Sequence, residues 1–261
     1  MMLTQHNLML LYLLTSLGQN AQGSEIINGR KVPEKLMLYM ASVQSNGDHV
    51  CGGFLISEDF VVTAAHCDKQ NPTHVVLGTH NLKKINDETM RYNVTRCKHP
   101  DFDNDNVKSG NDIMLLKLSR KARLDSNVQP IQLPKTGMKV KDKAKCRVAG
   151  WGFTKTGGKV VDTLKVAEVS IIDLKECKKR WKPRKVDLPD KVICAGGYQT
   201  KKGFCQGDSG GPLVYGPVAI GIVSFNMSKN CDYPNVPNIY TDISKYLPWI
   251  RKILKQKHCK T

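Results

Sequence analysis

A serine set among glycines in the last quarter of the chain is the first feature that could do chemistry. The stretch is Gly207-Asp208-Ser209-Gly210-Gly211, and an apolar segment follows it. Glycine reaches backbone conformations that other residues adopt only at a cost, so such a turn can aim its N–H groups at one point beside the serine oxygen. A carbonyl attacked by the serine needs those donors, because its oxygen becomes negatively charged. A polar turn without chemistry is the alternative interpretation of this stretch alone.

Two upstream stretches supply partners for a serine nucleophile. His66 ends the run Val62-Thr63-Ala64-Ala65-His66 before a cysteine, and Asp112 opens an apolar run that ends at Leu118. A serine hydroxyl is a weak nucleophile until a base within hydrogen-bond reach takes its proton, and histidine can be that base. A carboxylate beside the histidine would fix its tautomer. Taken singly, the histidine is more often a surface or core residue and the aspartate a turn residue.

In the order His66, Asp112, Ser209, nearly the whole chain resembles the trypsin-like serine proteases of the chymotrypsin fold. The resemblance implies two packed six-stranded antiparallel β-barrels with a C-terminal α-helix, and an acyl-enzyme mechanism. It assigns an oxyanion hole to the N–H groups of Gly207 and Ser209. It also matches Ser224 to the family serine that contacts the triad aspartate. Because all these positions are filled, we expect an active serine endopeptidase.

Short segments separated by turn signals must position these residues. Apolar and polar residues alternate, as in half-buried strands, within residues 39–44, 53–57, 75–78, 113–118, 146–152, 164–172 and 212–225. Asn46-Gly47-Asp48 is typical of a β-hairpin turn. Only residues 244–257 have clear helical spacing, with apolar residues on one face and lysines on the other. The pattern predicts an all-β barrel protein whose terminal helix packs on it; a helix lying on a membrane is the alternative.

The N-terminus indicates export and processing. An apolar run at residues 8–14 is too short to span a bilayer and is followed by small residues, which predicts a signal peptide over residues 1–23. Residues 24–25 would then be an activation dipeptide before a protease domain at residues 26–261. This arrangement resembles that of granzymes and mast-cell proteases, in which the freed amine pairs with the aspartate before the nucleophile. The pair here would be Ile26 and Asp208; signal cleavage directly before Ile26 is the alternative.

Nine cysteines predict disulfides and an oxidising compartment, although sequence alone does not fix the connectivity. The resemblance implies three pairs: Cys51–Cys67, Cys177–Cys194 and Cys205–Cys231. The family partner of Cys146 would lie six residues after the nucleophile, where this chain has Tyr215, so that bridge is absent. Cys97 could meet Cys259 and leave Cys146 as a buried free thiol, but the pairing of these three stays open.

The resemblance also locates a substrate pocket. Six residues before Ser209, tryptic members carry an aspartate that binds lysine or arginine, and this chain has Gly203. A buried substrate cation would lack its partner there, so tryptic cleavage is not expected. Asn226 and Asn238 match pocket-wall positions that are often glycine and should narrow the pocket. We expect a small or polar side chain before the scissile bond, with a medium apolar side chain or a chymase-like preference as alternatives. The expected pocket consists of Gly203, Phe204, Ser224, Phe225, Asn226 and Asn238.

Charge and minor motifs bear on partners. A net charge of +17 over 261 residues favours polyanions such as sulfated proteoglycans, although a basic surface without a dedicated partner is the alternative. No aromatic-interleaved basic motif indicates specific nucleic-acid binding. We expect a glycan on Asn93 of Asn93-Val94-Thr95, and none on Asn226, whose sequon falls on the pocket wall.

No metal or cofactor is expected, because His74, His80 and His99 lack ligand spacing and the acidic stretch at residues 86–88 is typical of a solvated loop.

Taken together, the sequence features predict a secreted or granule-stored, monomeric protease without a transmembrane segment. One rival interpretation is a non-enzymatic cationic binding protein on the same fold. Another is a restricted protease resembling complement factor D, which usually keeps the pocket aspartate that Gly203 replaces.

Overall fold

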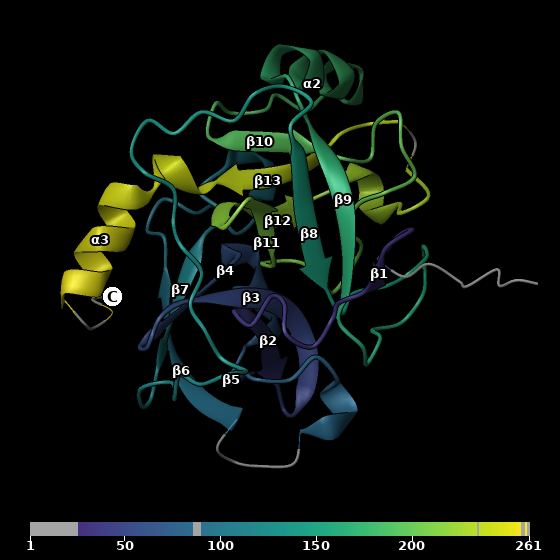
Figure 1. Ribbon diagram of the computed structural model, residues 1–261. Coiled ribbons are helices and arrows are strands. Elements are labelled where there is room, and N and C mark those ends of the chain that lie inside the picture. The colour runs from purple at the N-terminus through teal and green to yellow at the C-terminus, as the bar shows by residue number, and fades with distance from the viewer. Residues whose placement is uncertain (1–25, 86–89, 234, 257–258, 260–261) are drawn as a thin grey trace, which may run out of the picture.

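The computed structural model describes residues 26–85, 90–233, 235–256 and 259. The predicted signal peptide, the activation dipeptide and the acidic stretch at residues 86–88 lie outside them. Two β-barrels are stacked in Figure 1, the N-terminal one in blue below and the C-terminal one in green above. The predicted pair of six-stranded antiparallel barrels is confirmed.

The first barrel closes in the strand order β2-β3-β4-β7-β6-β5, with every neighbouring pair antiparallel. Its strands are β2 (Met40–Ser45), β3 (Asp48–Ser57), β4 (Phe60–Thr63), β5 (His74–Val76), β6 (Arg91–Lys98) and β7 (Met114–Leu118). The predicted hairpin turn joins β2 to β3. Asn46 and Gly47 have φ values of 51° and 92°, the left-handed pair that a two-residue hairpin needs.

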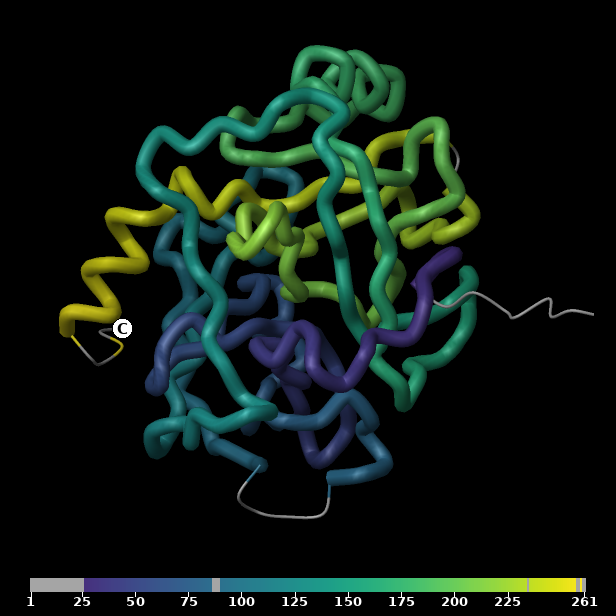
Figure 2. Tube along the Cα trace, viewed as in Figure 1, coloured from purple at the N-terminus to yellow at the C-terminus, as the bar shows by residue number. Residues whose placement is uncertain are grey.

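The second barrel closes because β8 pairs with both β9 and β11. Its strands are β8 (Lys145–Gly150), β9 (Lys165–Ile172), β10 (Val192–Ala195), β11 (Pro212–Tyr215), β12 (Val218–Phe225) and β13 (Asn238–Asp242). A short strand, β1 (Arg30–Lys31), adds to the outside of this ring by pairing with β9. In Figure 2, the teal segment between β7 and β8 connects the two barrels.

Two α-helices flank the barrels in the described part of the chain. α3 (Leu247–Gln256) packs Leu247, Ile250 and Ile253 into the apolar core of the first barrel, as expected. It begins three residues later than predicted, because the Asp242 side chain caps a separate 3-10 turn at Ile243–Lys245 instead. Residue 257 lies outside the described residues. No helix in the described ranges is long and apolar enough to cross a membrane.

α2 (Leu174–Trp181) was not predicted. Asp173 begins it by accepting the N–H groups of Lys175 and Glu176. Its buried face consists of Cys177 and Trp181, four residues apart. Two apolar positions in eight residues are too few for periodicity to reveal a helix. The other helical segments named in the described ranges are short 3-10 helices: η1 (Ala65–Gln70), η2 (Leu82–Lys84), η4 (Val107–Ser109), η5 (Lys182–Arg184), η6 (Met227–Lys229) and η7 (Ile243–Lys245).

Four disulfides crosslink the fold. The three implied pairs are present, and Cys97 of β6 bonds to Cys259 beyond α3. The last bridge ties the chain after the terminal helix to the first barrel. Cys146 remains a buried free cysteine, and its burial raises the pKa of the thiol to about 12. A neutral thiol in an apolar core behaves as a small hydrophobic group.

Candidate active site

The three predicted triad residues meet where the two barrels face each other. His66 lies on η1 directly after β4, and Asp112 precedes β7, so both come from the first barrel. Ser209 lies on the loop before β11 of the second barrel. The N–H of Gly52 in β3 donates to the Ser209 carbonyl over 2.8 Å, which holds the serine loop against the first barrel.

Asp112 is the buried anchor of this cluster. Its Oδ2 lies 2.8 Å from His66 Nδ1, and its Oδ1 accepts the His66 backbone N–H over 2.9 Å. Ser224 in β12 adds a third donor, its hydroxyl, over 2.5 Å. The Asp112 side chain is 1% exposed and the His66 side chain 21% exposed. The histidine therefore has a fixed ring and one edge still open to a substrate.

These contacts oppose the effect of burial on both ionisable groups. Burial alone would lower the pKa of His66, but the charge and hydrogen bond of Asp112 outweigh it and raise this pKa above 6.5. Burial alone would raise the pKa of Asp112, but His66, Ser224 and the His66 N–H together lower it. Asp112 thus stays ionised at neutral pH, while His66 can exchange a proton.

Ser209 and His66 line one hollow of about 210 Å³ at this junction. Four of the six expected pocket residues line it as well: Phe204, Ser224, Phe225 and Asn226. Gly203 and Asn238 do not line it. The sequence interpretation did not include the other lining residues, which are Val107, Cys205, Gln206 and Lys229.

Two glycines of the serine loop are required by the backbone. Gly207 and Gly210 have φ values of 90° and 82°, which side chains rarely tolerate. A Cβ on Gly210 would also lie 2.1 Å from Thr63 Oγ1, so a larger residue would push the loop off the first barrel. The loop therefore needs glycine at both positions, and the N–H groups of Gly207 and Ser209 remain the predicted oxyanion donors.

Residues 26–250 match the family model described as trypsin. The chain belongs to the trypsin family. Rat granzyme B is 40% identical over 258 residues, covering 95% of this chain and 99% of that protein. Human cathepsin G is 36% identical over 251 residues, covering 95% and 94%. The solved structure of human heparin binding protein is 30% identical, with a TM-score of 0.77 over 90% of this chain and all of that one. The resemblance seen in the sequence is confirmed.

A half-buried histidine contacts the serine loop of this trypsin-family chain, and the sequence interpretation missed it. His49 Nε2 lies 2.9 Å from the Gly207 carbonyl, and its Nδ1 lies 2.8 Å from Ser42 Oγ. Gln44 Nε2 donates to the same hydroxyl over 3.2 Å. Burial lowers the pKa of His49 to about 4, so the ring is neutral and donates its Nε2 proton to Gly207. Nothing in the spacing of a strand histidine points to a loop 158 residues away.

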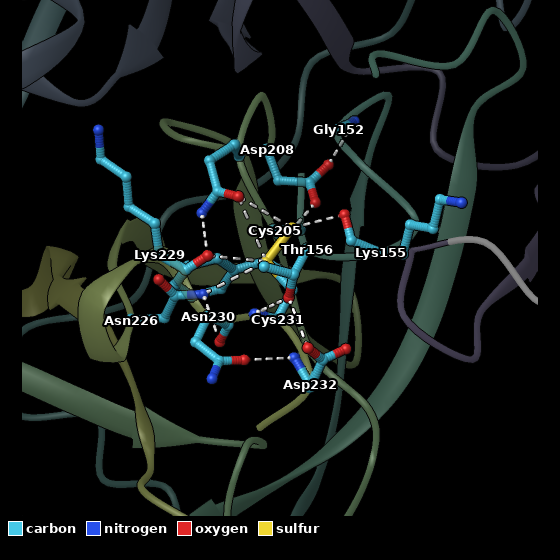
Figure 3. The surroundings of a disulfide bond; sticks show 12 residues. Gly152, Lys155, Thr156, Cys205, Asp208, Asn226, Lys229, Asn230, Cys231 and Asp232 are labelled. Atoms are coloured by element: carbon cyan, nitrogen blue, oxygen red, sulfur yellow. Dashed lines mark hydrogen bonds between the residues drawn. A yellow bond between two sulfur atoms is a disulfide. The ribbon is translucent and has the colours of Figure 1, made fainter. Parts of the chain in front are cut away.

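The Asp208 carboxyl turns away from the hollow into the second barrel. Its two oxygens accept the N–H groups of Gly152 and Cys205 over 2.8 and 2.9 Å, and Figure 3 draws the Gly152 contact beside the Cys205–Cys231 disulfide. Burial raises the pKa of Asp208 to about 7, although both hydrogen bonds oppose the rise. A Cβ on Gly152 would lie 2.5 Å from its Cγ, so only glycine lets the carboxyl fit. Ile26, the predicted partner, is also fully buried in the second-barrel core.

One group in the described part of the chain brings potential metal ligands together: Cys51, His66 and Cys67. Both sulfur atoms belong to a single disulfide, so they cannot bind a metal ion as thiolates. The histidine is already bonded to Asp112. This group therefore fits an acid–base role for His66 and not a metal centre.

Proposed function

We propose that this trypsin-family protein is a serine endopeptidase that hydrolyses protein substrates through an acyl-enzyme. The observation that carries the proposal is the buried Asp112 carboxylate on His66 Nδ1, in a histidine that shares its hollow with Ser209. That arrangement leaves Nε2 as the ring atom available to the serine. The triad logic then follows for this chain's own residues.

In the proposed reaction, Ser209 Oγ attacks the scissile carbonyl carbon while its proton passes to His66 Nε2. Asp112 stabilises the imidazolium that forms, and the N–H groups of Gly207 and Ser209 stabilise the oxyanion. The tetrahedral intermediate collapses when His66 gives its proton to the departing amine. A water molecule, deprotonated by the same nitrogen, then releases the acyl group from Ser209. No external electron donor or cofactor is required.

We further propose that the enzyme is activated when processing frees the amine of Ile26, which then pairs with Asp208. The buried Asp208 carboxyl accepts two N–H groups from the described part of the chain and has its pKa raised to about 7, and an ammonium beside it would restore its charged form. Ile26 is buried in the same barrel as Asp208. The pair would lock the residue next to the nucleophile in one position.

The finer expectations on specificity and location are part of this proposal. Gly203 supplies no negative charge, so the enzyme should cleave after small, polar or medium apolar residues and not after lysine or arginine. We propose export to the exterior or to a secretory granule. A glycan on Asn93 is compatible with its exposed position in β6. We propose sulfated proteoglycans as partners, because the charge of +17 favours polyanions.

The second candidate function is a cationic binding protein without peptidase activity. The likeness to human heparin binding protein and the net charge favour it. The filled triad positions weigh against it, because the acid–base contacts described above would have no use in a protein that only binds.

The test uses the full chain, expressed in secreting cells and processed so that it begins at Ile26. Incubation with a diverse peptide library, read by mass spectrometry, should show cuts after one class of residue that a Ser209→Ala control lacks. Cuts mainly after lysine or arginine would refute the predicted pocket specificity but would still support a peptidase. No cuts, with the Ile26 terminus confirmed, would favour the cationic binding protein.

A further inference from the structure

We propose that the Tyr233 side chain closes the floor of the substrate hollow, so that only small side chains fit before the scissile bond. The inference rests on the proposed peptidase function and narrows its substrate class. Tyr233 was not among the pocket residues expected from the sequence. It lies between β12 and β13, two residues after the disulfide cysteine Cys231.

The first observation is where the hollow ends. It has a volume of about 210 Å³, and its lining includes Phe204 but neither Gly203 nor Asn238. Phe204 is 3% exposed, with its ring edge-on to Tyr240 at 5.2 Å between centroids. Asn238 is 1% exposed and Gly203 is buried. The hollow therefore stops above the positions that would form a deep floor.

The second observation is what occupies that floor. A Cβ built on Gly203 would lie 2.7 Å from the Tyr233 hydroxyl oxygen, 2.9 Å from its Cζ and 2.3 Å from Asn238 Nδ2. The phenol ring thus reaches the space above Gly203 that a deep substrate side chain would enter. Gly203 has no side chain, but the site is not deep at this position, because Tyr233 and Asn238 fill the space beside it.

The third observation is that Tyr233 is held in place. Its hydroxyl donates to the Phe204 carbonyl over 3.0 Å, and its ring packs with Ile27 and the Cys205–Cys231 disulfide. The residue is 8% exposed. Moving it aside would break a buried hydrogen bond and expose apolar surface, so a substrate cannot displace it freely. The disulfide contact and the hydrogen bond therefore fix the ring behind Phe204 and Cys205, two residues that line the hollow.

The chemical consequence is a limit on side-chain size. An alanine or serine side chain fits above a closed floor, whereas leucine or phenylalanine would have to displace Tyr233. One methylene too many in a pocket typically changes the specificity constant by about 10- to 200-fold. We expect at least a tenfold preference for alanine over leucine, and a larger one over phenylalanine.

The experiment measures covalent labelling of Ser209 in the secreted chain, processed to Ile26. A fluorophosphonate without a side chain first reports whether Ser209 is reactive. Peptidyl diphenyl phosphonates with alanine, valine, leucine or phenylalanine at the reacting residue then give relative labelling rates by intact mass. The variants are Tyr233→Ala, Tyr233→Phe and the control Tyr215→Ala, which removes a tyrosine that is 38% exposed on β11.

Wild type and Tyr215→Ala should react at least tenfold faster with the alanine phosphonate than with the leucine one. Tyr233→Ala should reduce that ratio by tenfold or more. Tyr233→Phe, which loses only the hydroxyl, should raise the labelling rate of the valine phosphonate relative to the alanine one. If Tyr233→Ala does not fold, Tyr233→Phe is the variant that tests the inference. Equal wild-type rates for alanine and phenylalanine, or unchanged ratios in both Tyr233 variants, would overturn the inference while leaving a reactive Ser209. A Ser209 that resists the fluorophosphonate would overturn the peptidase proposal, and this inference with it.

Discussion

Ser224 of the second barrel donates its hydroxyl proton to Oδ2 of Asp112 in the first barrel over 2.5 Å. Thr241, also in the second barrel, donates to the Asp112 carbonyl over 2.9 Å. The aspartate that orients His66 is therefore anchored by the opposite barrel, through its side chain and its backbone. The relative position of the barrels sets the geometry of the triad.

Removal of the Ser224 hydroxyl should impair catalysis without unfolding the protein. In Ser224→Ala, Asp112 loses one of its donors, and a hydrogen bond to a charged group contributes about 1.5–3 kcal/mol. If that contribution is expressed mainly in the transition state, kcat/KM falls by roughly 10- to 100-fold. Peptide hydrolysis and thermal unfolding of the variant measure the two effects. Ser119→Ala, at an exposed serine, is the control, and an unchanged kcat/KM in Ser224→Ala would show that the contact is dispensable.

The activity should rise with pH through the pKa of His66. The neutral imidazole is the base, and Asp112 raises its pKa above 6.5, so kcat/KM should be half-maximal above pH 6.5 and fall tenfold per pH unit well below that point. In Asp112→Asn the burial effect is no longer opposed by a charge, so the residual activity should titrate at lower pH and be about 10⁴-fold weaker. A wild-type midpoint below 6.5, or the same midpoint in both proteins, would contradict this assignment.

The half-buried His49 should make the fold sensitive to acid. Its folded pKa of about 4 lies below the unfolded value of 6.5, so between these values the unfolded state binds a proton that the folded state does not. Stability is therefore lost as the pH falls from about 6.5 to about 4, by up to ~3 kcal/mol from this residue. Denaturant unfolding at pH 7 and pH 4.5 should give a smaller difference for His49→Gln than for wild type. An equal difference in the two proteins would exclude His49 as the source.

The triad and the barrels could be predicted because their signals are local. The glycines around Ser209 and the alternating pattern of the strands can each be recognised within about ten residues of sequence. The order of the motifs around His66, Asp112 and Ser209 then indicated the triad and the two-barrel fold. The floor of the hollow could not be predicted in this way. Gly203 and Asn238 were predicted to line the pocket, but neither lines the hollow. In the proposal above, the space beside Gly203 is filled by Tyr233, a loop residue whose ring direction no sequence pattern encodes.

The same distinction applies to the support of the site. The Ser42–His49–Gly207 hydrogen bonds join β2, β3 and the serine loop, which meet only after both barrels have closed. Neither the histidine nor the serine belongs to a motif. The sequence did not predict α2 for a related reason. Its capping aspartate and its two buried residues become informative only when the second barrel is there to cover them.

The thiol of Cys146 should be unreactive until the protein unfolds. It is 1% exposed and its pKa is about 12, so almost no thiolate is present at pH 8. An aromatic disulfide reagent should titrate no thiol in the native protein and one in denaturant without reductant. Cys146→Ala should titrate none in either condition. Three thiols in unfolded wild type would mean that the Cys97–Cys259 disulfide is open in solution.

If the Cys97–Cys259 disulfide is closed, replacing both cysteines (Cys97→Ser with Cys259→Ser) should lower the free energy of unfolding by roughly 3–5 kcal/mol.

Restoration of the tryptic aspartate should fail in this chain. In Gly203→Asp the new Cβ would lie 2.3 Å from Asn238 Nδ2 and 2.7 Å from the Tyr233 hydroxyl, so the carboxylate has no room to face a substrate. We expect a loss of about 1–3 kcal/mol in stability from overpacking, and no cleavage after lysine or arginine. Gly203→Asp combined with Tyr233→Ala removes the contact with the tyrosine ring and leaves only the Asn238 amide to be displaced, so it should cleave an arginine peptide at least tenfold faster than Gly203→Asp alone. Efficient cleavage after arginine by Gly203→Asp alone would show that Tyr233 yields to the new side chain, and that the floor is open in solution.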